Sequence, residues 1–164
     1  MSRDFRRMGA LGVAAAAAVA LGAAPASTAA AQPADPDFTL YAKEIPGEEE
    51  PTAPPAVGET FSFAEDLYRA KGGEKAGRSG VTCTVVRQGE QGGDVLCVGT
   101  FVLTGDPAGQ LSVQTLTSYS LTDEGPSAFD VAITGGTGDF ADARGYVRGA
   151  GEGDYQRLDF HLTD

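Results

Sequence analysis

The chain has 164 residues and a formal net charge of −11, from 23 acidic against 12 basic residues. A chain this acidic repels nucleic acid and anionic membrane surfaces, so neither is an expected partner. One histidine, two cysteines and scattered acidic residues offer no metal-binding cluster and no Ser/His/Asp arrangement. We therefore expect neither a bound metal nor hydrolytic chemistry.

Residues 1–31 have the pattern of a secretory signal peptide. Three arginines lie among the first seven residues, an apolar run extends from Met8 to Ala24, and small residues end the segment. The run is mostly alanine and is shorter than the roughly twenty residues that a membrane-spanning helix needs. We expect an extracellular protein whose residues 32–164 form a single domain. The Arg6-Arg7 pair leaves the export route, general or twin-arginine, open.

Eight short segments of the mature chain are predicted strands, because apolar and polar residues alternate in them or because they are rich in β-branched and aromatic residues. In chain order they are residues 35–44, 58–67, 81–87, 95–103, 110–120, 127–134, 143–148 and 155–162. Glycine-rich turns join them, and no helix is expected after the leader. The pattern favours an all-β fold, an eight-stranded antiparallel up-and-down β-barrel, over a sandwich. Such a barrel is filled by side chains or holds one small ligand.

Two connections stand out between these strands. Residues 45–56 contain four prolines and three consecutive glutamates, which predict an exposed, extended connection, either a flap over one barrel end or a linker. Residues 68–80 contain four glycines and four basic residues and predict a polar loop. A cationic loop could receive an anionic substrate, although a solvated surface is the commoner reason for such charge.

The two cysteines lie on consecutive predicted strands. If the reversal between these strands is centred near Glu90, Cys83 lies opposite Cys97, within reach of a bridge. An exported protein with two cysteines so placed is expected to form the Cys83–Cys97 disulfide.

Three glycines within four residues, Gly135, Gly136 and Gly138, follow an apolar strand and predict a β-hairpin turn. With Ala141 they also spell the start of a dinucleotide-binding fingerprint. That fingerprint requires a helix next, but four further glycines break any helix, and two aspartates lie where phosphate would bind. We therefore favour the hairpin and expect no nucleotide cofactor.

Residues 132–140 (AITGGTGDF) and 143–147 (ARGYV) resemble the signature of the allene oxide cyclase and dirigent-protein superfamily. Residues 61–68, 77–83 and 109–114 are similar to the cyclase branch in the same order. The resemblance implies a small antiparallel barrel with a central cavity, which steers cyclisation or coupling of a reactive small molecule without a cofactor. Related proteins tend to form trimers, so we expect a monomer or a homotrimer.

The resemblance also suggests catalytic residues. The cyclase branch has a glutamate after a tyrosine and an asparagine two residues further on, whereas here Ala42 follows Tyr41 and Glu44 takes the asparagine's place. Glu44 is a candidate general base, with a pKa raised by an apolar barrel, or simply the start of the acidic connection. Arg144 matches the arginine of the dirigent signature and is a candidate for binding or polarising the substrate.

Some features of the match leave alternatives open. Arg144 could instead form a structural ion pair with Asp139 or Asp142, and Gly138 replaces the acidic residue that lignan-forming dirigents carry. The cyclase branch also has a cysteine near position 83, which suggests a working thiol. In this chain the spacing between the preceding glycine and Cys83 differs by one residue from that of the cyclase branch. A shift of one residue along a strand moves a side chain to the opposite face of the sheet.

For ligand binding we expect contributions from Tyr41, Gln114 and Tyr119. Two functions remain from the sequence. The first is a secreted, cofactor-independent cyclase, isomerase or stereo-directing protein that acts on a small hydrophobic molecule in the barrel cavity. The alternative is a non-catalytic, lipocalin-like barrel that binds such a molecule.

Overall fold

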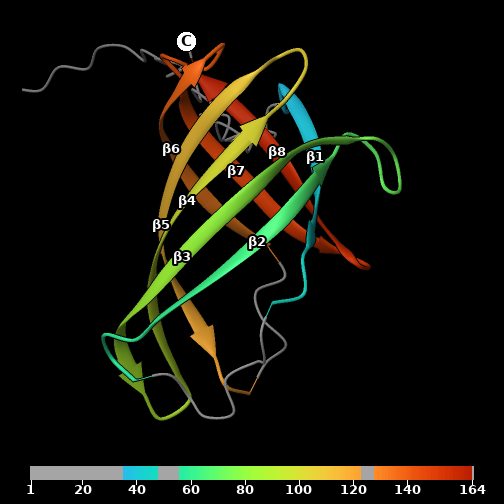
Figure 1. Cartoon of the computed structure of the whole chain (residues 1–164). Helices are drawn as coiled ribbons and strands as arrows, with labels where there is room; N and C mark the ends of the chain where they lie inside the picture. The colour runs from blue at the N-terminus through green and yellow to red at the C-terminus, as the bar shows by residue number, and fades with distance from the viewer. Residues whose placement is uncertain (1–34, 48–55, 123–127, 164) are drawn as a thin grey trace, which may run out of the picture. The chain divides into compact units, whose positions relative to one another are not determined.

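Eight antiparallel strands form a closed barrel (Figure 1). The computed structural model describes residues 35–47, 56–122 and 128–163. Each strand pairs with the next one along the chain, and the last strand returns to pair with the first. The strands are β1 (Phe38–Glu44), β2 (Thr60–Tyr68), β3 (Lys75–Gly89), β4 (Gly92–Leu103), β5 (Gly109–Ser120), β6 (Ala128–Gly138), β7 (Arg144–Glu152) and β8 (Tyr155–Thr163). The predicted eight-stranded antiparallel up-and-down barrel is confirmed.

Two predicted segments fall wholly or mostly outside the described residues. They are the signal peptide, residues 1–31, and the proline-rich connection, residues 45–56, of which positions 48–55 are not described. Within the described ranges, no helix has the length and apolar character needed to cross a membrane.

The loop predicted at residues 68–80 is shorter than expected, because β3 already begins at Lys75. Gly77 and Gly80 lie inside this strand and pair with Leu67 and Ala64 of β2. A side chain at Gly77 would place its Cβ 2.1 Å from the carbonyl oxygen of Val102 on β4. This glycine therefore permits close approach of a neighbouring backbone rather than forming a turn.

The glycine-rich run in β6 was also predicted to be a turn, but the strand continues to Gly138. The pairing of β5 with β6 shifts register between Ser112 and Val113, so the run contains an irregularity of the ladder. The reversal lies at residues 139–143, between β6 and β7. There the Asp139 carboxylate accepts a hydrogen bond of 2.8 Å from the backbone N–H of Ala108.

Apolar side chains fill much of the barrel in two clusters. The larger is built around Phe160, which is fully buried and stacks on Phe38 with ring centroids 4.4 Å apart and meets Phe101 edge-on at 5.3 Å. The smaller consists of Cys83, Val85 and Val95. Between the two clusters lies a space lined by residues of the larger cluster and by residues that pack against the smaller one. This space is where a ligand could be held.

The predicted disulfide is confirmed, since Cys83 and Cys97 are directly opposite partners of β3 and β4 and are bonded to each other. Cys83 is buried in the barrel interior with Val85, and Cys97 lies on the interior surface. The side chain at position 83 is therefore turned inward, but as half of a disulfide rather than as a free thiol.

Removing this bridge should destabilise the fold substantially. A double Cys83→Ala, Cys97→Ala variant should lose about 3 kcal/mol of unfolding free energy, because the bridge closes a loop of about fifteen residues in the unfolded chain. Urea unfolding followed by circular dichroism measures the loss. Reduced wild-type protein is the control and should match the variant, whereas equal stability of oxidised and reduced protein would contradict the prediction.

Candidate functional site

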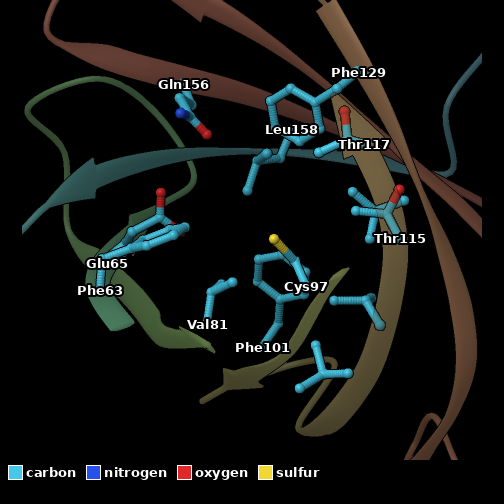
Figure 2. Close-up of a pocket in the computed structure, with 14 residues that line it drawn as sticks. Phe63, Glu65, Val81, Cys97, Phe101, Thr115, Thr117, Phe129, Gln156 and Leu158 are labelled. Carbon is cyan, nitrogen blue, oxygen red and sulfur yellow. The ribbon is translucent and has the colours of Figure 1, made fainter. Parts of the chain in front are cut away.

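The barrel interior contains a cavity of about 220 Å³ (Figure 2). Its wall is mostly apolar and is contributed by β2, β3, β4, β5, β6 and β8. The principal apolar side chains are Phe63, Val81, Phe101, Val113, Phe129 and Leu158. Four polar side chains interrupt this surface, namely Glu65, Thr115, Thr117 and Gln156. An apolar hollow with a few polar groups is the usual form of a small-molecule site.

Two glycines help to keep this space open. Gly99 lies on β4 between the inward residues Cys97 and Phe101, and a Cβ there would be 3.1 Å from Val81 Cγ2. Gly149 on β7 is the register partner of Phe129, and a Cβ there would fall 2.2 Å from Phe129 Cζ. The Phe129 ring therefore lies directly on the β7 backbone, where any larger residue would displace it.

Glu65 is the one ionisable side chain among the described residues that line the cavity. It is 5% exposed and lies on β2 between the inward residues Phe63 and Leu67. Its Oε2 accepts a hydrogen bond of 2.6 Å from Ser79 Oγ on β3. Burial raises the pKa of the Glu65 carboxyl, the Ser79 hydrogen bond opposes this rise, and the nearby charge of Glu44 adds to it.

The other polar groups lie across the cavity from Glu65 or at its edge (Figure 2). The Thr115 hydroxyl donates a hydrogen bond of 3.2 Å to the Asp130 carbonyl oxygen. In the described part of the chain, the Thr117 hydroxyl and the Gln156 amide make no hydrogen bond to protein. These two groups are therefore free to bind a ligand.

Two of the residues predicted from sequence lie on the interior face of the barrel. Glu44 is the last residue of β1, is exposed, and is the register partner of Glu65. Tyr119 lies on β5 two residues beyond Thr117 and packs against the cluster of Cys83, Val85 and Val95. Its hydroxyl oxygen is buried and has no hydrogen-bond partner among the described residues.

The other predicted residues lie outside the cavity. Tyr41 alternates with the buried Leu40 and Ala42, so it is on the outer wall, where Lys71 Nζ lies 5.6 Å from its ring centroid. Gln114 is exposed on the outer face of β5. These two side chains therefore do not converge with Glu44 and Tyr119 on one point, and the predicted binding roles of Tyr41, Gln114 and Tyr119 stay predictions.

Arg144 begins β7 and is exposed. Its Nη1 donates a hydrogen bond of 2.7 Å to the carbonyl oxygen of Ala143. Neither Asp139 nor Asp142 forms a salt bridge with it in the described structure. Arg144 does not line the cavity, and its catalytic role stays a prediction.

Glu65 is the site residue that sequence reasoning missed. The signal was present, because Glu65 occupies the apolar phase of an alternating strand together with Phe61, Phe63 and Leu67. A carboxylate in that phase is either buried or at a strand end. Its hydrogen-bond partner Ser79 is not recognisable from sequence, because it lies in the part of β3 for which the composition predicts a loop.

No protein-family model matches the chain, and no curated protein matches it. Solved structures do match the chain. One is titled pyocyanin demethylase, with 26% sequence identity and a TM-score of 0.61, covering 77% of this chain and 98% of that chain. Another is the pterocarpan synthase dirigent protein GePTS1, with 21% identity and a TM-score of 0.53, covering 77% of this chain and 87% of that chain.

Proposed function

The chain has the barrel fold of the allene oxide cyclase and dirigent-like family, and from this premise we propose that it converts a small hydrophobic molecule inside the barrel without a cofactor. The proposed activity is that of a cyclase, an isomerase or a stereo-directing protein. The names of both similar structures, a demethylase and a synthase, describe activities on small molecules, which supports an active barrel here.

The observation that carries this proposal is the Glu65 carboxyl in an otherwise apolar cavity. A carboxyl whose pKa is raised by burial can hold a proton, donate it to a bound molecule and take one back. The mostly apolar wall would hold the substrate in one orientation, which favours one product over others. The Thr117 hydroxyl and the Gln156 amide would orient the polar part of the substrate.

A second candidate function is a non-catalytic barrel that carries or sequesters the same kind of molecule. The mostly apolar cavity wall favours it, because apolar contact alone suffices for retention. In both cases we infer export of residues 32–164 after removal of residues 1–31, as a monomer or a homotrimer. The Cys83–Cys97 disulfide supports export, since disulfides persist in oxidising compartments.

Native mass spectrometry of protein recovered from its host medium tests both functions. We expect a retained small molecule that leaves on denaturation. The released molecule is then incubated with fresh protein and followed by liquid chromatography with mass spectrometry. Conversion supports the enzyme, and unchanged recovery supports the carrier. Protein that never retains or takes up any molecule would contradict both.

Two single substitutions beside Glu65 should move the pH dependence of turnover in opposite directions. If protonated Glu65 is the acid, turnover falls as pH rises through its pKa. Glu44→Gln removes a charge that raises this pKa, so the fall should begin at lower pH. Ser79→Ala removes a hydrogen bond that lowers the pKa, so the fall should begin at higher pH.

Profiles of kcat against pH with the recovered molecule measure these shifts, with the melting temperature as the check on folding. Arg144→Ala belongs in the same series. If its kcat equals that of the wild type, the predicted catalytic role of Arg144 is excluded. Identical pH profiles for Glu44→Gln, Ser79→Ala and the wild type would exclude Glu65 as the proton donor.

A further inference from the structure

The charges around the cavity all have the same sign. Glu65 lies inside, and Glu44 lies opposite it at the end of β1. In the described structure no lysine, arginine or histidine lines the cavity. The nearest basic residue on β1, Lys43, is on the outer wall with its Nζ 5.5 Å from the Tyr155 ring centroid. An anion entering this space would meet two carboxyl groups and no counter-charge.

Aromatic rings complete this environment. Phe63, Phe101 and Phe129 all line the cavity, and Figure 2 shows the Phe63 ring beside the Glu65 carboxyl with Phe101 and Phe129 further round the wall. The faces of aromatic rings attract cations, most strongly where water is excluded. Acidic groups together with aromatic rings in one hollow form a site suited to an organic cation.

We propose that the cavity selects flat organic cations, with the positive charge placed against the Glu65 carboxylate and the Phe63 ring. This inference rests on the proposed function, because it names the ligand class of the same cavity. The volume of about 220 Å³ is below the roughly 300–1,000 Å³ of sites for drug-sized ligands, so an ion of two fused rings is the appropriate size.

Binding of such a cation is coupled to release of a proton. In the empty cavity burial favours the protonated, neutral Glu65, and a bound cation favours the carboxylate. At a pH below the pKa of Glu65, up to one proton therefore leaves for each cation bound, and in that range affinity should rise by up to about tenfold per pH unit. The groups facing Glu65 are Ser79 from β3, Glu44 from β1 and Gln156 from β8, and of these only Glu44 carries a charge, which also favours the cation.

Isothermal titration calorimetry with three probes of similar shape tests the proposal. The probes are N-methylquinolinium, the uncharged 1-methylnaphthalene and the anion 1-naphthoate. We expect N-methylquinolinium to bind at least about tenfold more tightly than 1-methylnaphthalene, and 1-naphthoate to bind most weakly. Titrations in two buffers of different ionisation enthalpy should show proton release with N-methylquinolinium alone.

Glu65→Gln keeps the shape of the side chain and removes its charge. Its affinity for N-methylquinolinium should fall by about 30-fold or more, while its affinity for 1-methylnaphthalene is unchanged. Glu74→Gln is the matched control, because Glu74 is exposed in the turn between β2 and β3 and does not line the cavity. This variant should bind all three probes as the wild type does.

Equal affinity for the three probes, or tighter binding of 1-naphthoate, would overturn the cation preference while leaving the cavity as a binding site. Failure of all three probes to bind would also overturn it. Neither result decides the proposed function, which is tested separately by whether recovered protein retains and converts any molecule.

Discussion

A Gly99→Leu variant is expected to lose ligand binding while its stability changes only modestly. The leucine side chain would extend from β4 into the cavity between Val81 and Val113, whose methyl groups lie 3.1 and 3.4 Å from the new Cβ. It would occupy space that a ligand needs, so affinity should fall by at least about 100-fold. Filling a cavity with apolar atoms and replacing a strand glycine favour the folded state, whereas the new Cβ would lie only 3.3 Å from the carbonyl oxygen of Gly80, which opposes it. Stability should therefore change by less than about 2 kcal/mol.

Gly80→Leu is the control for this substitution. Gly80 lies on the neighbouring strand β3, and a Cβ there would have no heavy atom within 4 Å. It introduces the same residue on the outer wall, so it should leave binding unchanged. Calorimetry with N-methylquinolinium and thermal unfolding measure the two effects. Undiminished binding by Gly99→Leu would place the ligand elsewhere on the molecule.

Glu65→Gln is expected to abolish turnover and to make the fold less sensitive to rising pH. Loss of a positioned acid or base should reduce kcat by about 10²–10⁴-fold. The stability effect follows from linkage. The unfolded pKa is near 4.5, and burial raises the folded value, so the folded state binds more protons between the two. The contribution of Glu65 to wild-type stability is therefore most favourable below the unfolded pKa and is lost as pH rises through the folded pKa.

Melting temperatures of wild type and Glu65→Gln from about pH 4 to pH 8 measure this contribution. Other acidic groups affect both proteins alike, so the difference between the two curves isolates Glu65. The wild-type curve should fall relative to that of the variant as pH rises. Parallel curves would mean that the Glu65 carboxyl is not desolvated in the folded protein.

The alternation of side chains along single strands was enough to predict the barrel and its disulfide. In strands such as β8, the apolar residues Leu158, Phe160 and Leu162 lie on one face, so the sequence of the strand itself shows which face is buried. Cys83 and Cys97 could be paired from an expected reversal near Glu90. In the structure the turn pairs Gly89 with Gly92, and a register shift between Val85 and Arg87 brings the two cysteines opposite each other. The alternation is a local property of each strand, whereas the pairing of the cysteines also depends on this irregularity in the β3–β4 ladder.

The glycines were harder to interpret, because the same residue has two different uses. Gly136 and Gly138 were assigned to a turn on composition, whereas they lie within β6 beside β5. Gly99 and Gly149 lie within strands and carry no turn signal in the sequence, yet they shape the cavity wall. Whether a glycine forms a turn or makes room for a neighbour depends on which atoms of the adjacent strand lie next to it. The sequence of a single segment does not contain this information.

From its sequence alone, this protein could be assigned eight strands, an antiparallel barrel and a Cys83–Cys97 bridge, because strand periodicity and turn chemistry are local. Only the tertiary structure decided that Glu65 lies inside beside Ser79, and that Arg144 and Gln114 lie outside the cavity. Closing the barrel turns one face of every strand toward a common interior. The resulting cavity depends on side chains from six strands meeting at once, and their combined volumes and charges are a property of the closed barrel.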